Sequence, residues 1–212
     1  MDNKILDLHT HRQPPYPQGV ISVEPKAFNT VAGQYYSVGI HPWETLQGVP
    51  PELYRQLDIA AESPQTLAIG ECGVDIVKGG PMFRQLQVFK HHFELSERLR
   101  KPMVVHCVKA YDVILGLKRD LQPTQPWIIH GFRGKPAAAR MLVEARIGVS
   151  FGEKFNPESV KSVPDELIFA ETDESPLPIE EIISALSECA GHDLTPAISA
   201  NTSRLFPIDQ KR

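Results

Sequence analysis

Short apolar runs rich in β-branched residues alternate with amphipathic helical patterns, and this alternation constrains the fold more than any other feature. Runs of strand length are expected at 4–7, 20–23, 36–40, 67–70, 103–105, 127–129, 147–151 and 167–170. Apolar residues three or four apart predict helices at 51–61, 82–100, 110–121, 136–145, 179–190 and 196–205, with a shorter helix after Asn156. Such alternation is typical of βα units around a parallel sheet.

Eight strands are predicted, and helices follow the third to the eighth. The 212 residues suit one barrel at the lower end of the usual size range. Two short segments, the proline-rich 14–19 and 26–34, leave no room for crossover helices after the first two strands. We therefore predict an α/β fold with a single domain over 1–212, a TIM-like (β/α)8 barrel whose first two helices are reduced to loops. A doubly wound open sheet is the alternative.

Composition excludes several classes of function. The net charge of −4 gives no bulk attraction for nucleic acid, so any nucleic-acid substrate would be held by local groups or by metal. No signal peptide and no apolar run of membrane-spanning length are visible. Three cysteines with no repeated spacing predict no disulfide framework. We expect a cytoplasmic protein with no membrane association and no obligate protein partner.

The segment Asp7-Leu8-His9-Thr10-His11 follows the first apolar run. In a strand, residues two apart point the same way, so Asp7, His9 and His11 are expected to face one side. Two imidazoles and a carboxylate on one face can form part of a divalent-metal site. The alternative is a polar strand end with two solvated histidines.

Four further imidazole or carboxylate side chains follow predicted strands: Glu71, His106, His130 and Asp173. Singly, each has a structural explanation as a solvated carboxylate, a buried hydrogen-bonded histidine or a helix cap. Together they favour the barrel, because the C-terminal ends of barrel strands converge at one mouth. With His9 and His11 they make six candidate ligands, which are too many for one catalytic ion with an open position and suit two ions that share a carboxylate. Two ions can clamp a phosphate and lower the pKa of a bound water.

Six motifs and a C-terminal segment resemble, in chain order, the TatD-type metal-dependent hydrolases. The motifs are Asp-Leu-His-Thr-His at 7–11, Gly-Ile-His-Pro at 39–42, Ile-Gly-Glu-Cys-Gly-Val-Asp at 69–75, Val-His-Cys at 105–107, His-Gly-Phe at 130–132 and Glu-Thr-Asp at 171–173, with the segment 200–206. The resemblance implies a metal-bearing barrel and hydrolysis of phosphodiester bonds, often in DNA. The chain departs from the family in its missing first two helices and in the short loop 174–178.

The resemblance also implies roles for the six ligand candidates. One ion would be held by His9, His11 and Asp173, the second by His106 and His130, with Glu71 bridging the two. Two divalent ions are therefore expected, with zinc, magnesium, manganese and nickel as candidates. Asp173 and Glu71 are the expected catalytic residues, and Asp173 could also accept a proton from the attacking water.

Two further residues could contact the substrate. His41 could bind phosphate or a leaving group, or be a turn histidine before Pro42. Arg133, in a glycine-rich loop, could bind phosphate or remain a solvated loop charge. Trp43 could stack on a base or pack half-buried, and His91, His92 and His192 are expected at the surface.

The predicted function is that of a divalent-metal-dependent hydrolase, a phosphodiesterase or deoxyribonuclease acting on ester bonds, with DNA as a possible substrate. A metal-dependent amidase or lactonase on the same barrel is the first alternative, since the same kind of site attacks carbonyl carbons. A non-catalytic binding protein that keeps the barrel is the second.

Overall fold

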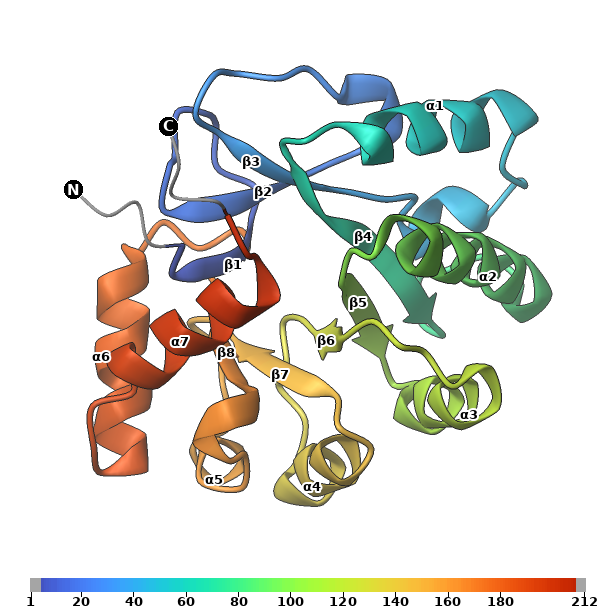
Figure 1. Ribbon diagram of the computed structural model, residues 1–212. Coiled ribbons are helices and arrows are strands. Elements are labelled where there is room, and N and C mark those ends of the chain that lie inside the picture. Colours follow the sequence, from blue (N-terminus) through green and yellow to red (C-terminus); the bar gives the residue numbers. More distant parts are fainter. Residues whose placement is uncertain (1–4, 209–212) are drawn as a thin grey trace.

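Eight parallel strands close into a barrel in the computed structural model, which describes residues 5–208 (Figure 1). The strands pair in chain order, and β1 closes the barrel on β8 through Asp7 and Ala170. Their bounds are β1 Asp7–Thr10, β2 Gly19–Val23, β3 Tyr35–Val38, β4 Thr66–Asp75, β5 Met103–Val108, β6 Trp127–Ile129, β7 Gly148–Phe151 and β8 Ile168–Ala170. The predicted (β/α)8 barrel is confirmed, and the open-sheet alternative is wrong.

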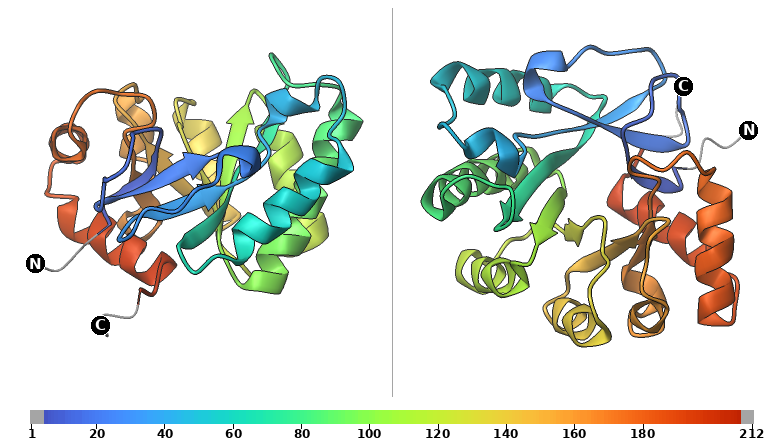
Figure 2. Two further views of the ribbon diagram at one scale, coloured as in Figure 1. Left: turned by 90° about the horizontal axis from the view of Figure 1, so that it is seen from above. Right: turned by 180° about the vertical axis from the view of Figure 1, so that it is seen from behind.

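Helices cover the outside of the barrel from β3 onward (Figures 1 and 2). Their bounds are α1 Pro51–Glu62, α2 Met82–Leu99, α3 Tyr111–Leu121, α4 Pro136–Glu144, α5 Pro157–Val160, α6 Ile179–Ala190 and α7 Thr195–Leu205. Short 3-10 turns occur at η1 Pro25–Ala27, η2 Pro42–Thr45 and η3 Asp165–Leu167. Only η1 lies between β2 and β3, and the β1–β2 connection is a loop, as the sequence predicts. Within the described range, no helix combines the length and apolar character needed to cross a bilayer.

The core has two apolar layers. The inner layer takes one residue from each of six strands: Leu8, Val20, Ala68, Val104, Ile128 and Phe169. The larger outer layer packs the strands against the helices. Phe206, which follows α7, also packs in the inner layer, and the Thr202 hydroxyl on α7 donates a hydrogen bond of 2.6 Å to the Ile5 carbonyl.

β4 and β5 are longer than the sequence predicts, so Glu71 and His106 lie within strands and not after them. Glycine permits this close pairing, because Gly73 (φ +153°) sits opposite His106 in the register. A Cβ at Gly73 would collide with the His106 carbonyl oxygen. The pairing holds β4, which carries Glu71, against β5, which carries His106, along their C-terminal halves.

β1 also differs from its predicted range of 4–7. It begins at Asp7 and continues to Thr10, which places His9 inside the strand; Lys4 lies outside the described residues. Backbone hydrogen bonds to the segment after β8 extend this pairing, because the Asp173 amide donates to the His9 carbonyl (2.9 Å) and the His11 amide donates to the Asp173 carbonyl (3.0 Å).

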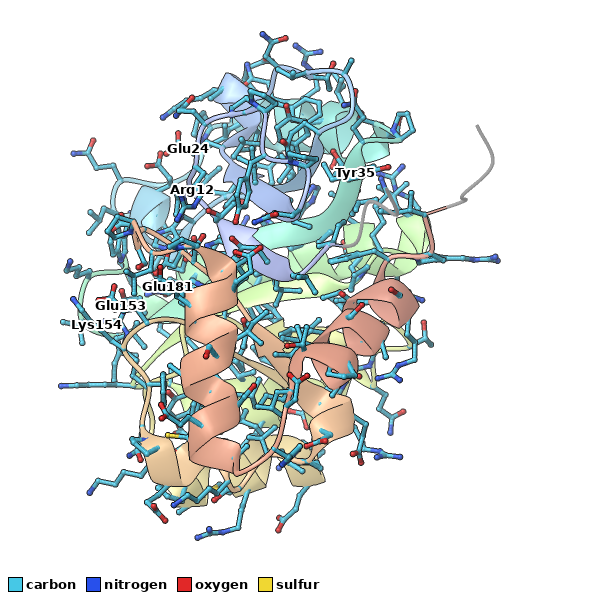
Figure 3. All side chains as sticks on the ribbon, turned by 90° about the vertical axis from the view of Figure 1, so that its left-hand side faces the viewer. Arg12, Glu24, Tyr35, Glu153, Lys154 and Glu181 are labelled. Carbon is cyan, nitrogen blue, oxygen red and sulfur yellow. The ribbon has the colours of Figure 1, made fainter. Side chains whose placement is uncertain are left out.

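The C-terminal ends of the strands form one mouth of the barrel. In the side view of Figure 3, Arg12, Glu24 and Lys154, which follow β1, β2 and β7, lie at one end of the molecule, while Tyr35, the first residue of β3, lies toward the other. The convergence expected of a barrel therefore holds for these strands.

Candidate metal centre

The Glu71 carboxylate lies at the centre of the mouth and is 8% exposed. Its Oε1 atom faces three imidazoles. The distances are 2.6 Å to His106 Nδ1, 2.8 Å to His130 Nε2 and 3.1 Å to His41 Nε2. These rings come from β5, from the loop after β6 and from the loop before η2, so three separate elements deliver nitrogen atoms to one oxygen.

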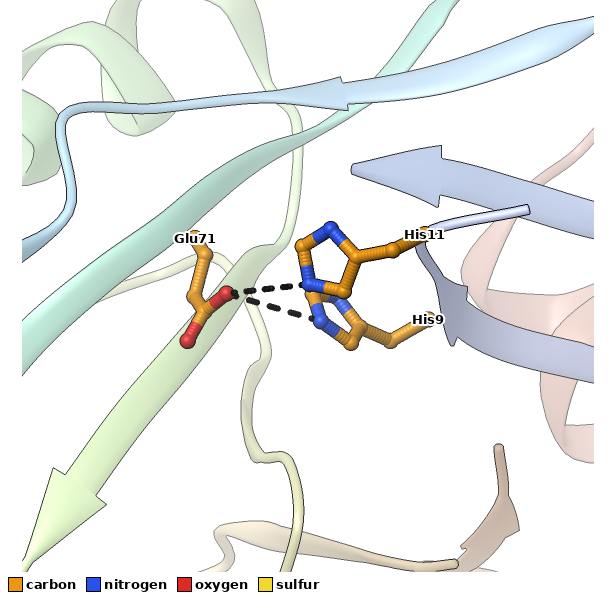
Figure 4. Close-up of side chains that lie close together, drawn as sticks. All are labelled: His9, His11 and Glu71. Atoms are coloured by element: carbon orange, nitrogen blue, oxygen red, sulfur yellow. Dashed lines mark ion pairs between the residues drawn. The ribbon is translucent and has the colours of Figure 1, made fainter. Parts of the chain in front are cut away.

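The other oxygen of Glu71 faces β1. Figure 4 shows His9 in β1 and His11 just after it, both pointing toward this carboxylate, with Nε2–Oε2 distances of 3.5 and 3.8 Å. Asp173 Oδ1 lies 3.8 Å from His9 Nε2 and 3.7 Å from His11 Nε2. Glu71 therefore stands between two groups of side chains, one on each of its oxygens.

The buried His9 ring lacks the partners that a neutral imidazole normally finds. Neither of its nitrogen atoms makes a hydrogen bond within the described residues, although the side chain is 0% exposed. Burial, followed by the nearby His130, lowers the pKa of His9 well below its usual value. A neutral, buried imidazole with a free lone pair fits a metal ligand, and a cation beside Nε2 would satisfy it.

Glu71 and His130 form a buried pair of opposite charges in the centre. Burial alone would raise the pKa of Glu71, but the His130 charge and imidazole hydrogen bonds outweigh it and hold this pKa well below the usual range. Burial would lower the pKa of His130, but Glu71 and then Glu171 raise it well above the usual value. Cation binding would replace the His130 proton as the countercharge of Glu71.

Asp173 has a different environment. Burial, and next the negative charge of Glu171, raise its pKa above the ordinary value. Its backbone has a positive φ of 52°, which Asp tolerates better than most residues. Asp173 forms an isolated parallel bridge with Thr10, which places it beside His9 and His11.

Three sets of side chains have ligand atoms within 4.8 Å of one another and could hold a cation. They are His9–His11–Glu71, His9–His130–Asp173 and His41–Glu71–His106. All six predicted metal ligands therefore meet at one place. His41, expected to contact substrate, lies among the ligand candidates as well.

The centre opens into a cavity of about 310 Å³, whose lining includes His11, His41, Trp43, Glu71, His106 and Asp173. Arg133 does not line this cavity. It is exposed and lines a neighbouring cavity of about 230 Å³, together with Lys154 and Ser175. Asp173 and Glu174 border both cavities, so Arg133 lies beside the centre but not in it.

Asp7 does not face the centre, which corrects the expectation that it shares a side with His9 and His11. Its carboxylate accepts hydrogen bonds from the Thr172 amide (2.9 Å) and hydroxyl (2.6 Å). The pairing register shifts between Asp7 and Thr10, and Leu8 packs into the inner core. This irregularity breaks the two-residue alternation on which the expectation rested. Burial raises the pKa of Asp7 to about 7.

Two carboxylates behind the histidines were not singled out from the sequence. Glu171 Oε1 accepts a hydrogen bond of 2.6 Å from the Gly131 amide and lies 3.4 Å from His130 Nδ1. Asp75 Oδ2 lies 3.4 Å from His106 Nε2. Metal-binding histidines commonly donate their second nitrogen to a carboxylate. Both carboxylates could have been identified from the sequence, because Asp75 and Glu171 belong to the motifs at 69–75 and 171–173.

His92 is buried, contrary to its expected place at the surface. Its Nε2 accepts a hydrogen bond of 2.9 Å from the Ile40 amide, and Nδ1 lies 2.8 Å from the Val88 carbonyl. The ring thus fastens α2 to the segment that leads into His41. His91 pairs with Asp58 and His192 with Asp165, both at least partly exposed.

Comparisons with known proteins agree with this geometry. The family model described as TatD related DNase matches residues 26–207. A 3'-5' ssDNA/RNA exonuclease TatD of Erwinia billingiae is 33% identical over 118 residues, which cover 55% of this chain and 44% of that protein. The uncharacterized metal-dependent hydrolase YcfH of Escherichia coli K12 is 27% identical over 202 residues, covering 84% of this chain and 75% of YcfH.

A solved structure has the same fold. The TatD homolog YJJV of Escherichia coli K12 superposes with a TM-score of 0.81 at 19% identity, over 97% of this chain and 98% of that one. The barrel is thus shared along essentially the whole chain, whereas the Erwinia match spans less than half of that enzyme's length.

Proposed function

This chain belongs to the TatD-related DNase family of metal-dependent hydrolases, and from that premise we propose that it cleaves phosphodiester bonds in single-stranded nucleic acid with two divalent ions. The observation that carries the proposal is the division of Glu71 between two groups of side chains, His41, His106 and His130 on Oε1 and His9 and His11 on Oε2. A carboxylate shared in this way suits a bridge between two ions.

The proposed ligand sets follow the predicted roles. His9, His11 and Asp173 would hold one ion, His106 and His130 would hold the other, and Glu71 would lie between them. His41, 3.1 Å from Glu71 Oε1, either contacts the substrate or completes the second set. Imidazole and carboxylate donors suit zinc, manganese or nickel, and magnesium less well. When bound, such ions polarise a phosphoryl oxygen and make water a stronger nucleophile at neutral pH.

The chain's own residues supply proton transfer and substrate contact. Asp173 would accept the proton of the attacking water, because its carboxylate lies beside His9 and His11 and lines the cavity. Arg133 and Lys154, exposed beside the same opening, contact phosphates that extend away from the scissile bond. These two local positive charges would attract phosphates although the net charge of the whole chain is −4.

Single-stranded nucleic acid is favoured as substrate because the Erwinia relative carries the name of an ssDNA/RNA exonuclease. The cavity of about 310 Å³ has room for a ligand near the size of one nucleotide. Family membership favours phosphodiesters over the amides or lactones of the alternative.

The test uses metal-stripped protein and a labelled single-stranded oligonucleotide, with zinc, manganese, magnesium or nickel supplied separately. We expect cleavage to depend on added metal. Asp173→Asn, which keeps the size of the side chain but loses the base, should lower turnover by about 100-fold or more. Intact oligonucleotide under every metal condition would contradict the proposed function.

A further inference from the structure

Trp43 lies directly beside the candidate metal centre. Its ring centroid is 4.5 Å from that of His41 and 6.2 Å from that of His106, and the side chain lines the same cavity. It is nevertheless 44% exposed. The tryptophan thus presents a large aromatic surface to solvent next to the expected site of bond cleavage.

The indole is held in place by polar contacts. Its Nε1–H donates a hydrogen bond of 2.7 Å to Asp75 Oδ2, and the Trp43 amide donates to His41 Nδ1 (3.2 Å). Asp75 in turn accepts hydrogen bonds from the Val77 and Lys78 amides (2.8 and 2.9 Å). A ring fixed before ligand arrives loses little conformational entropy on binding.

The surroundings of Trp43 combine exposed apolar surface with one exposed cation, Lys78. Leu46, Ile76 and Val77 are 58, 53 and 57% exposed. Their two loops lie side by side, because the Gly80 amide donates to Thr45 Oγ1 (3.1 Å). The Lys78 ammonium lies 4.6 Å from the Trp43 ring centroid on an exposed side chain. Exposed apolar side chains and a lysine beside the cavity suit a ligand that has both a flat apolar face and a negative charge.

We propose that Trp43 is the stacking platform for the nucleobase next to the scissile phosphodiester, with Lys78 contacting a phosphate of the same strand. The inference rests on the proposed function and names the residues of that site that would contact the base and a phosphate of the single strand. A base in a duplex is already stacked and paired, so a platform of this kind selects unpaired strands. On binding, the base takes the place of the Lys78 ammonium over the ring.

A purely structural role for Trp43 predicts different behaviour. Asp75, which accepts the indole hydrogen bond, also lies 3.4 Å from His106 Nε2. Trp43 could therefore act only by positioning Asp75 and through it His106. Trp43→Phe removes the hydrogen bond and keeps an aromatic face, whereas Trp43→Leu removes both.

The experiment compares two single-stranded substrates of equal length, oligothymidylate and an oligonucleotide of abasic residues. In Trp43→Leu we expect kcat/KM for oligothymidylate to fall by about tenfold or more, with less than about a twofold change for the abasic strand. Trp43→Phe should keep most of the preference for oligothymidylate. Equal losses on both substrates in both variants would overturn stacking in favour of the positioning role.

Binding measured by fluorescence separates failure of this inference from failure of the proposed function. The only other tryptophan, Trp127, is 0% exposed, so quenching by added oligonucleotide reports on Trp43. We expect oligothymidylate to quench the emission and the abasic strand to leave it nearly unchanged, even if neither strand is cleaved. Absence of quenching by oligothymidylate would overturn the inference, whatever the activity.

Lys78→Gln provides a matched variant at the same platform. It removes one phosphate contact and leaves the indole and its hydrogen bond in place. We expect the slope of log affinity against log salt for oligothymidylate to decrease by about 1 in magnitude. An unchanged slope would remove Lys78 from the proposed subsite.

Discussion

At the scale of single residues, Glu71 is the side chain on which the proposed metal centre depends. Glu71→Gln keeps the size of the side chain but removes its charge and one acceptor oxygen. We expect bound metal to decrease and turnover on a single-stranded oligonucleotide to fall by at least about 100-fold. Glu24→Gln is the control, because Glu24 borders the same cavity but pairs with Lys26 at 2.8 Å. Near wild-type metal content and turnover in Glu71→Gln would contradict the bridging role.

His92 gives a prediction for stability against pH. Burial lowers its pKa to about 4 in the folded protein, from 6.5 when unfolded. Between these pH values the unfolded chain therefore binds more protons than the folded protein. The stabilising contribution of His92 is fully present above pH 6.5 and is lost as the pH falls toward 4. The contribution of His92 to this loss is about 3 kcal/mol.

Urea unfolding at pH 7 and pH 4 measures this contribution. In His92→Gln, whose amide does not titrate, the loss of unfolding free energy between the two pH values should be smaller by about 3 kcal/mol than in the wild type. His91→Gln is the control, because His91 is the neighbouring histidine of α2 and is partly exposed beside Asp58. The same pH dependence in His92→Gln and wild type would show that His92 does not remain neutral in the fold.

The residue types of the site were predictable, but some of their directions were not. His9, His11, Glu71, His106, His130 and Asp173 follow from polar residues placed near apolar strands. Asp7 was misplaced because strict alternation fails where the register shifts, and no local residue preference marks that shift. His92 was misplaced because its burial depends on the Ile40 amide, which is remote in sequence.

At the scale of elements, the close pairing of β4 and β5 positions Glu71 against His106. Gly73→Ala forces a methyl group against the His106 carbonyl, so we expect a loss of unfolding free energy of about 2 kcal/mol or more and lower activity. Gly116→Ala in α3 is the matched control, because no atom lies within 4 Å of the added Cβ. It should be neutral or slightly stabilising. Equal stability of the two variants would contradict the constraint at Gly73.

The strand order was predictable while strand ends were less so. Apolar runs bounded by turn residues identify each strand, and a barrel then needs only their order. The ends of β4 and β5 depend on pairing across the glycines of β4, and the end of β1 depends on bonds to Asp173. These are contacts between distant segments, so they are absent from any local pattern.

At the scale of the whole molecule, bound ions should stabilise the fold, because they join β1, β4, β5 and the loops after β6 and β8. Removal of metal by a chelator should lower the Tm by roughly 5–10 °C, and resupplied metal should restore it. The Glu71→Gln variant should show a much smaller change. A wild-type Tm that is unaffected by chelation and by added metal would argue against a metal centre in this barrel.

The position of the ions themselves tests the central claim most directly. Crystals grown with manganese or zinc should show two anomalous-scattering peaks per chain, one on each oxygen of Glu71, with His9 and His11 at the first and His106 and His130 at the second. A single peak, or peaks remote from Glu71, would contradict the two-ion account.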